Sequence, residues 1–276
     1  MIDILLSTYN GERFLEKQLD SILAQTYTEW RLLIRDDTSS DSTRAILEKY
    51  QHLNPQKIIL FPNNINKNIG VIKSFENLLE CSNKEYIMFC DQDDIWLPNK
   101  IEVTLNTMKD LEAKHSTQTP IAVHSDLTLI DENENIIHNS FWQFSNIRPD
   151  ILNTNIKFLA ISNSATGCTI MINKALKKRI LPFPQKVYMH DMLIALTACK
   201  YGIHHPKNEP LILYRQHNNN TIGATEYEFN IINKIKNLKQ IILKAHKMYH
   251  YNPKLYKNII DFWLTKIKYI ITRSIK

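Results

Sequence analysis

The sequence predicts an α/β fold in which a mainly parallel central sheet is flanked by helices on both faces. Strand and helix signals alternate through the first hundred residues, and polar clusters stand where three of the expected strands end. The 276 residues include only 5 Gly and 10 Pro, which argues against long disordered stretches. Strands that alternate with helices in this way form parallel sheets.

The elements of the first hundred residues follow from apolar periodicity. The first strand is expected at Ile2–Ser7, before a turn signal that begins at Thr8, and Phe14 to Leu23 has helical spacing. Three further strands are expected, with helices around residues 46–50 and 75–79 between them: Trp30–Ile34, Lys57–Phe61 and Tyr86–Cys90.

The pattern changes after residue 120. Four more strands are expected at residues 121–130, 136–144, 165–172 and 210–215, with a helix at residues 192–201. From Phe229 the spacing is helical through Ile231 and Ile235, and a further helix follows Pro253. We therefore expect a catalytic domain at residues 1–225, with halves at 1–100 and 101–225, and a helical extension at 226–276.

The positive charge is concentrated in this extension. Residues 226–276 hold eleven Lys or Arg against three acidic residues, a net +8, so residues 1–225 are at −2 within the total of +6. The apolar side of the last expected helix consists of Ile259, Phe262, Trp263, Ile267 and Ile270. Basic amphipathic helices bind anionic membrane surfaces. Packing on the catalytic body and a homodimer interface are the alternatives.

The sequence also indicates the compartment. Four scattered cysteines without a C-x-x-C pair fit reduced thiols, and the first ten residues lack the basic start and long apolar run of a signal peptide. No apolar run approaches the roughly 20 residues that span a bilayer. We expect a cytoplasmic protein, with peripheral contact to the inner face of the membrane.

The sharpest chemical signal is the run Asp91-Gln92-Asp93-Asp94, directly after a buried strand. Three carboxylates so close together repel one another unless a cation joins them. Oxygen ligands suit Mg²⁺ or Mn²⁺, which proteins hold through one or two carboxylates plus substrate phosphates. We therefore expect Asp91 and Asp93 to bind such a metal, while Asp94 could instead cap a helix near Leu97.

These clusters resemble one family in order along the chain. Residues 7–12 (STYNGE), 35–41 (RDDTSSD), 68–70 (NIG) and 91–96 (DQDDIW) are similar to the motifs of family-two glycosyltransferases, from residue 2 to about residue 220. The resemblance implies the Rossmann-like GT-A fold. The DQDDIW variant looks closest to bacterial rhamnosyltransferases and relatives that build capsules and O-antigens.

The resemblance implies roles for individual residues. The expected nucleotide-sugar contacts are Thr8, Tyr9, Glu12, Asp36, Asn68, Gly70 and Asp91, with Asp36 on the base and Asp91 on the ribose and the metal. Asn68 and Gly70 could equally well be a helix start with an Asn cap. Asp91 and Asp93 become metal ligands.

Two later motifs have matching implications. His190-Asp191 stands before an apolar helix, where similar enzymes place an acidic general base, so Asp191 is the expected base and His190 an acceptor contact. His217 resembles the histidine that returns to the metal or the diphosphate, and Arg215 could pair with phosphate. A helix-capping Asp191 and a surface His217 are the plain alternatives. Trp96 is either an acceptor-sugar platform or a core aromatic residue.

The resemblance implies inverting transfer of a sugar from a nucleotide-sugar, dTDP-rhamnose or a UDP-sugar, to a glycan acceptor. We expect this acceptor to be lipid-linked, in bacterial surface polysaccharide synthesis. A nucleotidylyltransferase is the alternative enzyme, although the single glycine in Thr8–Arg13 does not match a Gly-rich triphosphate loop. A basic nucleic-acid-binding protein is the non-enzymatic alternative, but aromatic and basic residues do not interleave on the expected sheet. We expect no nucleic-acid partner.

Overall fold

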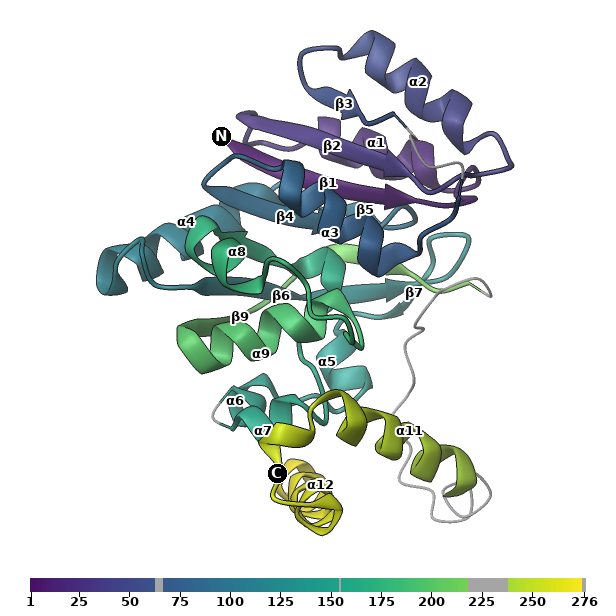
Figure 1. The fold of residues 1–276 in the computed structure, drawn as a ribbon. Helices are drawn as coiled ribbons and strands as arrows, with labels where there is room; N and C mark the ends of the chain where they lie inside the picture. Colours follow the sequence, from purple (N-terminus) through teal and green to yellow (C-terminus); the bar gives the residue numbers. More distant parts are fainter. Residues whose placement is uncertain (63–66, 154, 218–237, 275–276) are drawn as a thin grey trace.

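The computed structural model describes residues 1–62, 67–153, 155–217 and 238–274. Its centre is one mixed sheet with the strand order β3-β2-β1-β4-β8-β6-β9-β5, and β7 pairs with β6 at the side (Figure 1). The first four strands in this order are parallel. They are β3 (Ile58–Leu60), β2 (Trp30–Asp36), β1 (Ile2–Thr8) and β4 (Tyr86–Cys90).

The other half of the sheet has mixed strand directions. β8 runs antiparallel to both β4 and β6, whereas β6 and β9 are parallel. The bounds are β5 (Ile95–Trp96), β6 (Ile121–Ile130), β7 (Ile136–His138), β8 (Met171–Asn173) and β9 (Ile203–Arg215). The expected α/β sheet is confirmed, and its strands are all parallel only in the N-terminal half.

Helices cover both faces of the sheet. One face is packed by α1 (Leu15–Leu23), α2 (Thr43–Leu53) and α4 (Lys100–His115). The other is packed by α3 (Val71–Cys81), α8 (Lys174–Ile180) and α9 (His190–Tyr201). In β1, Ile4 and Leu6 enter the first core and Leu5 enters the second, as the two-residue period of a strand requires. Burial on both faces explains the apolar run at residues 4–6 of β1.

A third apolar cluster attaches the C-terminal helices to this body. The short helices α5 (Phe141–Phe144), α6 (Pro149–Leu152) and α7 (Ile156–Leu159) meet α11 (Leu238–Tyr251) and α12 (Ile259–Ser274), with the turn η2 (Pro253–Leu255) between the last two. The expected boundary at residue 225 and the helical positions Ile231 and Ile235 lie outside the described residues. None of the described helices is long and apolar enough to cross a membrane.

Three local predictions were wrong. The expected strand at residues 136–144 ends at His138, because Ser140 accepts a hydrogen bond from Gln143 N and caps α5. The expected strand at residues 165–172 is a 3₁₀ turn, η1 (Gly167–Thr169), followed by β8. Asp94 caps no helix, because β5 follows it and α4 begins only at Lys100.

Candidate active site

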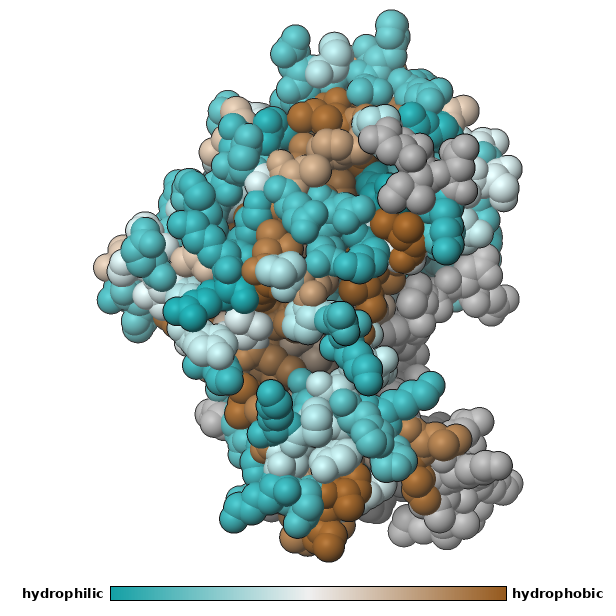
Figure 2. Space-filling model, viewed as in Figure 1, coloured by the Kyte–Doolittle hydropathy of each residue, from teal (hydrophilic) through white to brown (hydrophobic). Residues whose placement is uncertain are grey.

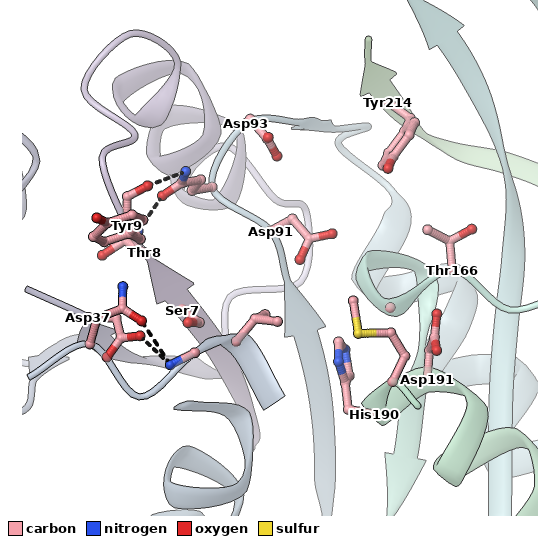
Figure 3. Close-up of a pocket in the computed structure, with 16 residues that line it drawn as sticks. Ser7, Thr8, Tyr9, Asp37, Asp91, Asp93, Thr166, His190, Asp191 and Tyr214 are labelled. Carbon is pink, nitrogen blue, oxygen red and sulfur yellow. Dashed lines mark hydrogen bonds between the residues drawn. The ribbon is translucent and has the colours of Figure 1, made fainter. Parts of the chain in front are cut away.

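A cavity of about 420 Å³ opens at the carboxyl ends of β1 and β4, next to the start of α9 (Figure 3). This is the edge of a parallel sheet where α/β proteins bind their ligands, and the volume is that of a small-molecule site. Its lining includes Ser7, Thr8, Tyr9, Asp37, Asn68, Gly70, Val71, Asp91, Gln92, Asp93, Thr166, Gly167, Met189, His190, Asp191 and Tyr214. The sequence-predicted residues Thr8, Tyr9, Asn68, Gly70, Asp91, Asp93, His190 and Asp191 therefore share one cavity.

The expected nucleotide contact Asp36 lies behind the cavity wall. It is 4% exposed, and its Oδ1 accepts hydrogen bonds from Thr8 Oγ1 at 3.0 Å and from Ser39 Oγ. Asp36 stands opposite Thr8 in the β1–β2 register, which explains the contact between their side chains. In this structure Asp36 orients Thr8 and does not line the cavity.

Its neighbour Asp37 lines the cavity and fixes the loop before α3. Its carboxylate accepts hydrogen bonds from Ile69 N and from Gly70 N, the latter at 2.7 Å, and it pairs with Arg35 at 3.1 Å. Gly70 has φ of 83°, a conformation that glycine adopts without strain, and it precedes α3. The sequence-based assignment missed Asp37, although the doubled Asp36-Asp37 offered both candidates.

The turn after β1 is hydrogen-bonded to residues 91–94, which we call the acidic loop. Tyr9 N donates to Gln92 Oε1 at 2.8 Å, and Gln92 Nε2 donates back to Tyr9 O at 3.0 Å. Gln92 thereby sets the distance between Tyr9 and the carboxylates on either side of it. Glu12, the other residue expected here, points elsewhere: its Oε2 accepts from Ser42 N at the start of α2, and it is absent from the cavity lining.

The acidic loop is electrostatically strained. Burial, followed by repulsion from Asp93 and Asp191, raises the pKa of Asp91 to about 7. The same causes, burial first and then Asp93, raise the pKa of Asp94 well above its usual range. A divalent cation at the loop would remove this repulsion and lower both values.

Asp93 and His217 form a ligand pair that could hold such a cation. His217 Nε2 lies 2.9 Å from Asp93 Oδ2, and the two side chains line a second cavity of about 510 Å³ that shares Tyr9 and Gln92 with the first. Carboxylate oxygens and one imidazole suit Mn²⁺ or Mg²⁺. Asp91, Asp93 and His217 therefore have the chemistry to hold the metal that the sequence predicts.

A second group of potential ligands fits that metal less well. Ligand atoms of Asp91, Asp94 and Cys168 lie within 4.8 Å of one another. Asp94 and Cys168 are fully buried, however, and burial raises the pKa of the Cys168 thiol well above its usual range. A cysteine sulfur is a soft ligand that suits Zn²⁺ better than Mg²⁺ or Mn²⁺, so this group matches the expected metal less well.

Trp96 belongs to the core under the acidic loop. It is 2% exposed, and Lys100 Nζ lies 3.6 Å from the centre of its ring. The Lys100 ammonium is fully buried and has no hydrogen-bond partner among the described residues, and burial lowers its pKa to about 7. In this structure Trp96 is a core aromatic residue next to a buried amine, and it does not reach the cavity.

Arg215 is also buried rather than open to a phosphate. Its side chain is 0% exposed, its Nε donates to Asp93 O at 3.0 Å and its Nη2 pairs with Glu134 at 3.3 Å. Its backbone N donates to Asp94 Oδ1, and its guanidinium lies 4.6 Å from the Phe14 ring centre. These contacts tie the acidic loop to the end of β9, two residues before His217. A phosphate contact would require this network to open.

The opposite wall of the cavity carries the expected base. Asp191 lies in the first turn of α9, and Figure 3 shows it across the cavity from the acidic strand end. Burial raises its pKa to about 7, opposed by hydrogen bonds from Met192 N and the Asn163 side chain. A carboxylate that changes charge near neutral pH can act as a general base.

His190 is held rigidly beside it. Its ring centre lies 4.3 Å from that of Phe75, and neither ring nitrogen has a hydrogen-bond partner among the described residues. Burial lowers its pKa to about 3, so the ring is neutral. A Cβ added to Gly167 would lie 2.6 Å from His190 Nε2, which explains the glycine.

The sequence did not predict the remaining residues that line the cavity. Gln92, Gly167 and Tyr214 reach the cavity from three different parts of the chain. Gln92 stands inside the run Asp91–Asp94, and Tyr214 directly precedes Arg215, which the sequence had already indicated. Gly167 lay in a segment expected to be a strand, so nothing pointed to it.

Acidic side chains at the strand ends of an α/β sheet, with a further carboxylate in the same cavity, form a ligand-binding site of the α/β class. Residues 3–180, more than half of the chain, match the family described as Glycosyl transferase family 2. The chain belongs to this family and is a glycosyltransferase. The nucleotidylyltransferase and nucleic-acid alternatives are thereby set aside.

Two relatives carry the names of sugar transferases with different donors. The chain is 30% identical over 257 residues to dTDP-rhamnosyl transferase RfbG of Shigella flexneri, covering 88% of this chain and 80% of RfbG. It is 27% identical over 202 residues to the UDP-Glc:alpha-D-GlcNAc-diphosphoundecaprenol beta-1,3-glucosyltransferase WfgD of Escherichia coli, covering 72% and 70%.

Solved structures share the fold. Mannosyltransferase PcManGT from Pyrobaculum calidifontis, in complex with GDP-Man and Mn²⁺, matches with a TM-score of 0.58 and 15% identity, over 99% of this chain and 74% of that chain. S. aureus TarS 1-349 in complex with UDP-GlcNAc matches with a TM-score of 0.55 and 17% identity, over 88% of this chain. The chain spans 66% of that TarS structure, just under two thirds.

Proposed function

We propose that the enzyme transfers a sugar from a nucleotide-sugar to an acceptor hydroxyl with inversion at the anomeric carbon. The observation that carries this proposal is that Asp91 and Asp93 share one cavity with Asp191, which comes from a distant part of the chain. A metal held by Asp91 and Asp93 would bind the charged diphosphate of the donor. Asp191 would accept the proton of the hydroxyl that attacks.

The proposed reaction is a single displacement. Asp191 takes the proton of the acceptor hydroxyl as its oxygen attacks the anomeric carbon. The bond between that carbon and the diphosphate oxygen breaks, and the nucleoside diphosphate leaves with the electron pair. One displacement inverts the centre, whereas retention would need a second nucleophile.

Asp93, Asp91 and His217 would hold Mg²⁺ or Mn²⁺. When bound, the metal neutralises charge on the leaving diphosphate. Donor contacts are assigned to Thr8, Tyr9, Asn68, Gly70 and Asp91, which line the cavity. Glu12, Asp36 and Arg215 are assigned supporting positions behind them, on the contacts described above, while His190 stays an acceptor-side residue.

The donor is proposed as dTDP-rhamnose, with a UDP-sugar as the alternative. The names of RfbG and WfgD support these two classes. The acceptor is proposed as a glycan on a lipid carrier in bacterial surface polysaccharide synthesis, since the name of WfgD includes a diphosphoundecaprenol acceptor. The enzyme would then work in the cytoplasm at the inner face of the membrane, with residues 1–225 as the catalytic domain.

A nucleotide-sugar panel tests the proposal. The protein is heated with dTDP-rhamnose, UDP-glucose, UDP-GlcNAc or GDP-mannose, each with Mn²⁺ or with EDTA. A donor at 100 times its Kd stabilises the native state by about 2.7 kcal/mol, and we expect this shift with one donor class and only with Mn²⁺. If no nucleotide-sugar raises the melting temperature, the proposal is wrong.

A further inference from the structure

We propose that the outward face of α12 docks the enzyme on an anionic lipid bilayer. Four large apolar side chains form a stripe on this face: Ile260, Leu264, Ile267 and Ile271, which are 65%, 62%, 51% and 57% exposed. Their spacing of four, three and four residues puts them on one side of the helix. Figure 2 shows hydrophobic surface at this end of the molecule, over α12.

The stripe is exposed because α12 packs on the protein through its opposite side. The opposite side of the helix buries Phe262, Thr265 and Tyr269. The Phe262 ring lies 5.1 Å from that of Tyr256, and the Tyr269 ring lies 5.5 Å from that of Phe158 in α7. The helix is thus already attached to the catalytic body through one face, and the second apolar face is left for an occupant.

The attachment also fixes the direction of the stripe. Lys157 of α7 forms an ion pair with Asp261 at 2.8 Å, next to Ile260 in the first turn of α12. Contacts to the body are therefore present near the start of the helix and again at Tyr269 toward its end. The stripe is a continuous surface along about three turns, parallel to the helix axis.

The charge around the stripe fits an anionic surface. Residues 238–274 contain eight Lys or Arg and a single acidic residue, Asp261. Because Asp261 is paired with Lys157, it offsets little of this charge toward an outside partner. Lys257 and Lys268 are exposed, and Lys268 directly follows Ile267 of the stripe. An apolar face bordered by lysines is the composition of helices that lie in a membrane interface.

A second copy of the chain is the competing occupant, since four apolar positions at this spacing could also pack helix on helix. Pairing two copies through this face would bring two segments of the same strong positive charge together. Anionic lipids instead supply the opposite charge, at about 1 kcal/mol for each Lys or Arg near the surface. The charge therefore favours the bilayer.

Further exposed apolar side chains lie outside the stripe. On α11, Ile242 and Leu243 are 45% and 54% exposed, and Lys247 is exposed on the same helix. The inference rests on the proposed function in one respect only: docking would bring the cavity to a lipid-linked acceptor. Vesicle binding itself requires neither donor nor metal.

The test measures binding of the full chain to vesicles by flotation. Vesicles of phosphatidylcholine alone are compared with vesicles containing 30% phosphatidylglycerol, which we take as roughly the anionic content needed for a clear electrostatic signal. Wild-type protein should float with the anionic vesicles at low salt and lose most of this binding in high salt. The double variant Leu264→Ser/Ile267→Ser should lower the partition coefficient about tenfold or more.

Two further variants make the comparison specific. Lys257→Gln/Lys268→Gln should weaken binding to anionic vesicles about tenfold and leave weak binding to neutral vesicles unchanged. The matched control is Ile136→Ser/Ile137→Ser, which removes two apolar side chains on β7 that are 63% and 46% exposed. This control should bind vesicles like the wild type.

The outcomes separate the alternatives. Loss of binding only in the α12 variants supports the inference. No flotation of the wild type, equal loss in the β7 control, or a dimer in sedimentation equilibrium that Leu264→Ser/Ile267→Ser converts to monomer without any lipid binding would each overturn it. Melting temperature and donor-induced stabilisation are measured on every variant. A wild type that floats but responds to no donor would contradict the proposed function alone.

Discussion

Replacing Asp191 by Asn tests whether Asp191 is the general base, because the substitution changes only one heavy atom of the side chain. The variant keeps the size and can still accept a hydrogen bond from Met192 N, but it cannot take a proton. General-base catalysis contributes about 10²–10⁴-fold, so turnover should fall within this range while donor binding persists. A fall of less than about tenfold in turnover, with Mn²⁺ saturating, would show that Asp191 positions the acceptor or caps α9 without acting as the base.

The pH dependence gives an independent measure. Burial raises the pKa of Asp191 to about 7, and only the ionised carboxylate can accept the proton. Activity of the wild type should therefore fall by about tenfold for each pH unit below roughly 7 and level off above it. Asp91 has a pKa near the same value, but a bound cation lowers it, so saturating Mn²⁺ assigns the midpoint to Asp191.

The same pKa predicts a stability change with a defined sign. A carboxyl whose folded pKa is about 7 and whose ordinary pKa is 3.8 is disfavoured when charged, so the folded state loses stability as pH rises from about 4 to 7. A shift of roughly three units corresponds to about 4 kcal/mol at most. Partial exposure of the side chain reduces this to about 2 kcal/mol.

Asp191→Asn cannot ionise and should escape this loss. Urea unfolding of the metal-free protein should give equal stabilities for wild type and variant near pH 4, and a variant that is more stable by about 2 kcal/mol at pH 8. A variant that is less stable at pH 8 would refute the raised pKa and, with it, the physical reason for assigning the base.

Three further predictions concern the metal, the buried arginine and the glycine. Asp93→Asn should weaken Mn²⁺ binding, followed by electron paramagnetic resonance, by at least about tenfold without unfolding the protein; unchanged binding would move the site elsewhere. Arg215→Lys, which keeps the charge but loses the fork of donors, should weaken Mn²⁺ binding more than Arg31→Lys, an equally conservative change in the half-buried ion pair with Asp3 at the start of β1; equal effects would indicate general destabilisation. Gly167→Ala should reduce transfer by displacing His190, and full activity would show that the ring can shift at no cost.

Much of the fold was predictable because local periodicity was unambiguous. The buried strands β1, β2 and β4 and the amphipathic helices α1, α2 and α3 appear where apolar spacing predicted them. Prediction failed at residues 136–144 and 165–172, where single side chains redirect the backbone. Ser140 starts a helix by accepting one hydrogen bond, and a 3₁₀ turn places Gly167 against His190. The apolar spacing of these short segments fits a strand as well as a turn or a short helix, so periodicity could not distinguish them.

The candidate site was likewise predictable only in part. The sequence located polar groups at strand ends, and the cavity contains Thr8, Tyr9, Asp91, Asp93 and Asp191 together. It could not tell which polar neighbours would face the cavity. Asp36 turns toward Thr8 across the strand pair, leaving the cavity to Asp37, and the Arg215 guanidinium is enclosed by three distant segments.

By itself the sequence determined the α/β class, the order of the elements and the residue types from which the site is built, because these depend on local spacing and on strand-end position. Only the tertiary structure decided that Trp96 lies in the core, that Arg215 braces the acidic loop, and that α12 buries Phe262 while exposing Ile267. The sequence placed Ile267 on the same apolar side as Phe262, but the structure covers one face of α12 and leaves the other exposed. Which of them is covered depends on contacts with α7, about a hundred residues earlier in the chain, and such long-range packing leaves no trace in local periodicity.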